Sequence, residues 1–157
     1  MARPLTIHGI RDKMKAAFEV ADRFEPDDEV QAHLARHLCV LSAGFIEESL
    51  RIVLTTYAEA RCDARCRTFI EKHLERAPNP RPGNIMELLG SFDTEWKKAL
   101  EEFFSLEDGD GAIGSLIANR HLIAHGRDSQ VSLRRVKDWH AVAIKMIERV
   151  EGCVSGA

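Results

Sequence analysis

Apolar residues recur every three or four positions along nearly the whole chain. This spacing matches the 3.6-residue period of an amphipathic helix, and no stretch alternates long enough to predict a strand. No internal repeat or low-complexity tract is present. The pattern predicts an all-α protein, a helical bundle of about five to seven helices. We expect one domain over residues 1–157, with its core at about 27–152 and an N-terminal helix within 1–25.

The helix boundaries follow from residues that favour helix ends. Pro26 and the two aspartates after it are typical of a first turn. Gly126 is expected just past a helix C-terminus, and Ser132 is expected to cap the last helix. Residues 77–84, which contain three prolines, predict a loop, and residues 107–111 predict a turn. The expected helices span about 6–24, 26–61, 63–76, 84–90, 93–106, a segment ending at 126, and 132–151.

The longest predicted helix carries two apolar stripes, which indicates burial on two sides, as in a bundle centre or a dimer contact. Glu48 falls in the first stripe, between Phe45 and Ile52. A buried carboxylate is costly unless it is paired. Glu48 or its neighbour Glu47 is therefore expected to meet a basic partner, or else to reach solvent at the stripe's edge. The stripes are Val30, Leu34, Leu38, Leu41, Phe45, Ile52, and Ile46, Leu50, Val53, Tyr57.

The composition is that of an ordinary globular protein. The chain has 157 residues, 45% of them hydrophobic and 30% charged, which is enough for a core without a metal or disulfide. No run approaches 18 apolar residues, so no membrane partner is expected. The first residues lack the apolar region of a signal peptide. We therefore expect a cytoplasmic protein whose four cysteines are reduced.

Metal-binding patterns are weak. Cys62 and Cys66 are four positions apart but lack the paired CxxC motifs of zinc modules. His33 and His37 lack the glutamate of an HExxH motif. His140 has no recognisable partner set in the sequence. We expect no metal and no cofactor.

Charge is unevenly distributed although the net charge is only −3. Residues 93–110 contain seven acidic and two basic side chains, whereas residues 119–137 contain five basic side chains, including Arg127, and one acidic one. A locally basic surface suits contact with phosphates. A solvated helix face is the alternative interpretation.

The candidate chemistry lies in NRHLIAHG, residues 119–126. Arg120 and His125 are five positions apart, which directs them about 140° apart on a helix. They can share a site if two copies face each other across a two-fold axis. The helix end favours a protonated His125, and an imidazole can donate or accept a proton near neutral pH. Arginine fits phosphate oxygens, so these groups suffice to cleave RNA without a metal. Alternatively, His125 only complements the helix dipole.

Four segments resemble one known family. They are FIEESLRIVL at 45–54, NPRPGNIMELLGSFDTEWKKAL at 79–100, LIANRHLIAHG at 116–126 and VSLRRVKDWH at 131–140. In this order they resemble the RiboL-PSP-HEPN branch of the HEPN superfamily, which consists of helical bundles. Arg120, the polar His121 and His125 match the R-x4-6-H motif of its ribonuclease members.

The resemblance implies a homodimer in which two such motifs line one cleft. Arg120 would hold the scissile phosphate and His125 would be the general acid and base. His121 and Asn119 would orient His125 or contact RNA. The products would carry 2′,3′-cyclic phosphate and 5′-hydroxyl ends.

Supporting roles and partners follow from the same resemblance. Arg127, Glu47 and Glu48 would support the site or bind RNA, and the substrate would be single-stranded or loop RNA. Such domains resemble toxins or antiphage components that are neutralised by a cognate antitoxin. The alternative is a non-catalytic HEPN adaptor that binds RNA or a nucleotide, or that only dimerises.

Overall fold

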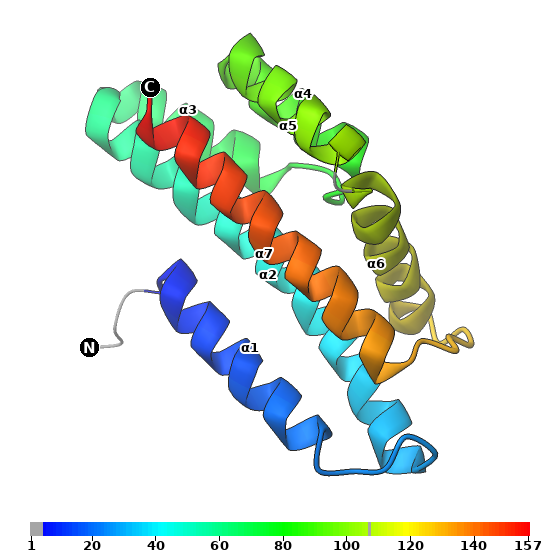
Figure 1. The fold of residues 1–157 in the computed structure, drawn as a ribbon. Coiled ribbons are helices and arrows are strands. Elements are labelled where there is room, and N and C mark those ends of the chain that lie inside the picture. Colours follow the sequence, from blue (N-terminus) through cyan, green and yellow to red (C-terminus); the bar gives the residue numbers. More distant parts are fainter. Residues whose placement is uncertain (1–4, 107) are drawn as a thin grey trace.

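The computed structural model describes residues 5–106 and 108–157, and within them the chain forms seven α-helices and no strand (Figure 1). The predicted all-α class is confirmed, with a helix count at the upper end of the expected range. None of these helices is both long enough and apolar enough to span a bilayer. The helices are α1 (Ile7–Ala21), α2 (Glu29–Arg61), α3 (Ala64–Glu75), α4 (Pro82–Phe92), α5 (Thr94–Leu106), α6 (Gly109–Ala124) and α7 (Leu133–Ser155).

Helix α2 is the centre of the bundle. It packs against α1, α3, α6 and α7, and Figure 1 shows α7 running alongside it. Helix α2 is therefore buried on more than one side, as its two apolar stripes predicted. Leu38, Phe45 and Ile46 are almost completely buried, whereas Val30 and Leu41 are 45% and 37% exposed. The first stripe is therefore covered only in part.

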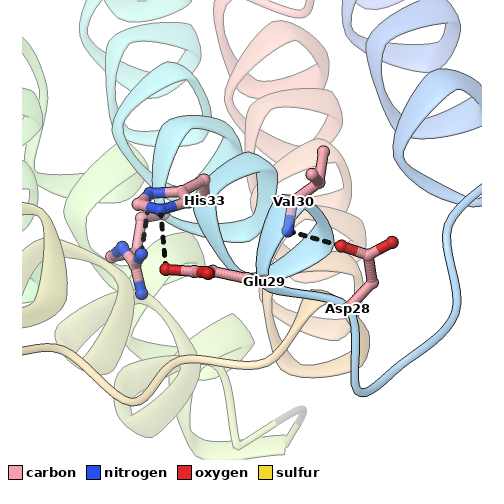
Figure 2. Close-up of polar contacts among 5 residues, drawn as sticks. Asp28, Glu29, Val30 and His33 are labelled. Atoms are coloured by element: carbon pink, nitrogen blue, oxygen red, sulfur yellow. Dashed lines mark hydrogen bonds and ion pairs between the residues drawn. The ribbon is translucent and has the colours of Figure 1, made fainter.

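The start of α2 is fixed by Asp28, not by Pro26. The Asp28 Oδ1 atom accepts a hydrogen bond from the Val30 backbone N–H at 2.8 Å, as Figure 2 shows. One turn on, His33 pairs with Glu29 at 3.8 Å and contacts Arg36 at 2.9 Å. The helix thus begins about three residues later than predicted, because the aspartate side chain satisfies a free N–H of the first turn.

The turn predicted at 107–111 is shorter in the structure. Its first residue, Glu107, and residues 1–4 of the chain lie outside the described residues. Asp108 adopts a left-handed φ of 49°, and α6 begins at the next residue. Gly109 packs so closely on Phe103 that a Cβ there would lie 2.9 Å from its ring. This tight connection brings α5 and α6 together and makes residues 109–111 helical instead of a turn.

Candidate functional site

Helix α6 carries the NRHLIAHG segment and ends within it. Gly126, at φ 65°, donates its N–H to the Ile123 carbonyl at 3.1 Å. The Arg127 N–H reaches the Leu122 carbonyl at 2.9 Å. These two bonds form a Schellman motif, which confirms the predicted role of Gly126. His125 becomes the C-cap residue, held at the very end of the helix.

The Arg120 side chain points from α6 toward α2 and the loop before α4. Its Nη1 donates to the Oδ1 atom of Asn79 at 3.1 Å, and its Nη2 lies 3.5 Å from an Oε1 of Glu47. The side chain is 29% exposed and that of Glu47 is 41% exposed. Glu47 therefore has the basic partner that the sequence predicted. Together, Glu47 and Asn79 fix the direction of the guanidinium.

Asn79 is a site residue that the sequence interpretation missed. Its backbone carbonyl accepts hydrogen bonds from the Arg81 N–H and from the Asn84 side chain, both at 2.7 Å. These bonds hold the proline-rich loop, so the Asn79 side chain is presented to Arg120 in a defined position. The only signal in the sequence was a polar residue between prolines, which predicts a loop but not its contacts.

A cleft of about 360 Å³ opens beside Arg120, between α2, α4 and the loop at 77–80. Arg51 and Glu48 also line it, and the Arg51 Nε donates to Glu48 at 3.0 Å. This hydrogen bond raises the pKa of Arg51. Glu48 is thus paired as predicted, but with a neighbour on its own helix. The cleft contains two guanidinium groups and has a mixed polar and apolar lining.

The two histidines of the segment form a separate group. The His121 and His125 rings lie 4.4 Å apart between centroids and are tilted by 59°. Both residues are exposed. Within residues 5–106 and 108–157, neither ring forms a hydrogen bond or ring contact with Arg120, and neither histidine lines the cleft. The chain therefore presents Arg120 and His125 in different directions, as their five-residue spacing on a helix predicts.

Asn119 is held by contacts within the chain. Its Nδ2 donates to the Ser115 carbonyl at 2.9 Å, and its Oδ1 accepts from Ser129 Oγ at 2.9 Å. Ser129 is buried in the loop between α6 and α7. These bonds tie the end of α6 to that loop. Arg127 is exposed just after the helix. In residues 5–106 and 108–157, no three His, Cys, Asp or Glu side chains cluster closely enough to hold a metal ion.

A comparison with protein families decides the identity of this bundle. The family model described as RiboL-PSP-HEPN matches residues 10–156. The chain belongs to the RiboL-PSP-HEPN family. No curated protein and no solved structure matches it.

The match includes part of α1 and every later helix, so the HEPN domain contains all the candidate site residues. In this HEPN domain α6 carries Arg120, His125 follows it as the C-cap residue, and α2 carries Glu47. The resemblance inferred from four sequence segments is confirmed at the level of the family.

Proposed function

We propose that this HEPN protein is a metal-independent endoribonuclease that acts as a homodimer on single-stranded or loop RNA. One observation carries the proposal. Glu47 and Asn79 hold the Arg120 guanidinium at the wall of an open cleft, while His125 is exposed at the end of the same helix. A cation that binds phosphate and a group that transfers protons are the minimum set for this reaction.

The proposed reaction uses the ribose itself as the nucleophile. A neutral His125 accepts the proton of the 2′-hydroxyl, and that oxygen attacks the adjacent phosphorus. The bond from phosphorus to the 5′-oxygen breaks, and this oxygen takes a proton from a protonated imidazole. Arg120 stabilises the negative charge that develops on the phosphoryl oxygens. The products are a 2′,3′-cyclic phosphate and a 5′-hydroxyl.

The separation of Arg120 from His125 supports a dimeric site. The cleft beside Arg120 contains no histidine from its own subunit. A second copy related by a two-fold axis would bring its own exposed His125 to the first copy's Arg120, and the reverse. His121 lies next to His125 and would orient that ring or supply the second proton-transfer group.

Phosphate can reach Arg120 at small cost in free energy. The Arg120–Glu47 ion pair is partly exposed, and pairs of this kind contribute about 0–1 kcal/mol. A phosphate oxygen can therefore replace Glu47 or share the guanidinium with it. Glu47 and Asn79 act as positioning residues, because they hold the side chain near the cleft before RNA arrives.

A non-catalytic adaptor is the second candidate, and the cleft itself favours it. It holds Arg120 and Arg51, whose guanidinium groups can contact the phosphates of RNA or a nucleotide, beside three glutamates and without an imidazole.

Cleavage of RNA in EDTA by the purified protein separates the two candidates. We expect cleavage with cyclic phosphate ends, and we expect Arg120→Ala and His125→Ala each to abolish it while the protein stays folded. Arg149→Ala is the control, because Arg149 is an exposed arginine on α7 that lies outside the basic stretch and does not line the cleft. Binding without cleavage would establish the adaptor function and refute the nuclease.

We also propose a role as a toxin or antiphage component that acts in the cytoplasm and is neutralised by an antitoxin protein. The mechanism makes this testable in cells, because growth arrest would depend on the same two side chains. Induced expression of the wild-type chain should stop growth, and expression of His125→Ala should not. Equal growth inhibition by both would contradict the proposal.

A further inference from the structure

A second cleft, of about 500 Å³, lies where the loop between α6 and α7 meets the start of α2. Figure 1 shows the first turns of α2 and α7 at the same end of the bundle as this loop. The cleft shares no lining residue with the cleft beside Arg120. Its charged lining consists of three cations and one acid, namely Arg36, Arg134, Lys137 and Asp22. It therefore has a surplus of positive charge.

This positive charge is not neutralised from within the cleft. Lys137 pairs with Asp22, the single acid of the lining. Arg36 donates from its Nη2 to the Nδ1 atom of His33 at 2.9 Å, and an imidazole carries no negative charge. Arg134 is exposed, and its side chain has no hydrogen bond or ion pair within residues 5–106 and 108–157. Two guanidinium groups are left for an anion, whereas the first cleft holds two arginines against three glutamates.

The acidic segment before α2 does not change this balance. Residues 25–29 include four acids, but none of the four lines the cleft. The Asp28 carboxylate caps α2, and that of Glu29 lies 3.8 Å from His33. Within the described chain, none of the four pairs with an arginine of the cleft. The two guanidinium groups thus remain available to a ligand.

The wall of the cleft continues directly from His125. Ser129 lines the cleft four residues after His125, so their Cα atoms are at most about 14 Å apart. The Ser129 hydroxyl donates to Asn119 at 2.9 Å, which ties this wall to the end of α6. Stacked nucleotides rise about 3.4 Å each, so about four of them span that distance. A strand bound at His125 can therefore continue into the cleft.

Phosphate is the anion that fits this position. Guanidinium groups bind phosphate oxygens through paired donors, and phosphate contacts position a strand without reading its sequence. We propose that this cleft holds backbone phosphates of the RNA strand a few nucleotides from the bond cleaved at His125, with Arg36 and Arg134 as the phosphate ligands. RNA is the expected strand because the proposed function places RNA at His125, so the role of the cleft rests on that function. An acidic protein segment is the competing ligand.

Binding of a short fluorescent 2′-O-methyl oligonucleotide to the full-length protein in EDTA tests the cleft. Without a 2′-hydroxyl the strand cannot be cleaved, so fluorescence anisotropy reports binding alone. We expect Arg36→Gln and Arg134→Gln each to weaken binding about tenfold, which is the loss of one charge-assisted contact. Each should also flatten the slope of log affinity against log salt concentration by about 0.7.

Arg65→Gln is the matched control, because Arg65 is an exposed arginine beyond the opposite end of α2. It should leave affinity and salt slope unchanged. Since the Arg134 side chain has no hydrogen bond or ion pair within the described residues, Arg134→Gln keeps the test valid even if Arg36→Gln fails to fold. Wild-type affinity and slope in a folded Arg134→Gln protein would overturn the proposal.

Competitors identify the class of ligand. Unlabelled oligonucleotide should displace the probe at lower concentration than polyglutamate of the same length or inorganic phosphate. Stronger displacement by polyglutamate would assign the cleft to an acidic protein segment, and stronger displacement by phosphate would assign it to a free anion. Either result would overturn the proposal.

Cleavage of ordinary RNA separates this proposal from the ribonuclease itself. We expect Arg134→Gln to raise KM about tenfold with kcat unchanged, because a contact remote from the cleaved bond is the same in the ground state and the transition state. A wild-type protein that leaves RNA intact but shows the predicted loss of binding in Arg134→Gln would refute the nuclease and retain the phosphate site. Cleavage with an unchanged KM in this variant would refute the phosphate site alone.

Discussion

The side chain of Asn119, which precedes Arg120, forms hydrogen bonds within its own chain. The family resemblance implied that Asn119 orients His125 or contacts RNA. In the structure its amide joins the Ser115 carbonyl to the Ser129 hydroxyl, so both of its ends are engaged. Its effect on His125 would be indirect, because it holds the loop that follows the helix end.

The Asn119–Ser129 pair should therefore be coupled in stability. We expect Asn119→Ala and Ser129→Ala each to lower the free energy of unfolding by about 1–3 kcal/mol, since each leaves a partly buried polar group unpaired. The loss of unfolding free energy in the double variant should be smaller than the sum of the two single losses by about 0.5–3 kcal/mol, because the two residues belong to one hydrogen-bond network. Urea denaturation of all four proteins measures this. Strict additivity would show that the hydrogen bond contributes nothing.

His140 is the residue whose environment differs most from the sequence interpretation. The sequence shows no recognisable partner set for it, yet it is buried among aromatic rings. Burial, together with the nearby charge of Arg11, lowers its pKa to about 4. The unfolded chain keeps the ordinary value near 6.5, so it binds this proton at a higher pH than the folded protein does.

Stability should consequently fall as the pH is lowered from about 6.5 to about 4. The contribution of His140 to this loss is about 3 kcal/mol, because each pKa unit corresponds to about 1.4 kcal/mol. Between pH 7 and pH 4, we expect the free energy of unfolding of His140→Leu to fall by about 3 kcal/mol less than that of the wild type, as measured by urea denaturation. If the free energy of unfolding changed equally with pH in the two proteins, His140 would not be a buried neutral histidine.

At the scale of elements, the end of α6 determines where the imidazoles lie. Gly126 closes the helix in a left-handed conformation, and the two Schellman hydrogen bonds depend on it. The helix end then fixes the C-cap residue His125, with His121 one turn before it. The position of His125 thus depends on Gly126.

Replacing Gly126 tests this dependence. A side chain at φ 65° is strained, so Gly126→Ala should lower the free energy of unfolding by about 1–2 kcal/mol and reduce RNA cleavage. Gly114→Ala is the matched control within α6, because a Cβ there would meet nothing within 4 Å. Alanine at that helical position should stabilise the protein by about 0.5–1 kcal/mol. Equal changes in the free energy of unfolding for Gly126→Ala and Gly114→Ala would rule out a capping role of Gly126.

Much of the element structure could be predicted because helical periodicity and end signals are local. The predicted helices all exist, and Gly126 and Ser132 end and begin helices as expected. Apart from the start of α2, the features that the sequence did not predict depend on how distant segments pack. The left-handed Asp108, the Asn79–Arg120 hydrogen bond and the burial of His140 depend on which helices pack together. No local pattern encodes that packing.

At the scale of the whole molecule, the arrangement of the described helices separates an arginine-lined cleft from a pair of exposed imidazoles. Arg120 faces α2 and the proline-rich loop, whereas His121 and His125 contact each other at the end of α6. This division is what a site shared between two copies requires. Under the proposed function, RNA cleavage would need two copies of the chain, which predicts that two inactive variants can complement each other.

The most direct test mixes two inactive variants, Arg120→Ala and His125→Ala, under conditions that allow subunits to exchange, and measures RNA cleavage in EDTA. A mixed dimer keeps one Arg120 on one chain and one His125 on the other. If these groups meet across the two-fold axis, one complete site is restored and cleavage returns in part. If mixed dimers form, as mass measurement would show, but RNA stays intact, the arginine and the histidine do not act across subunits.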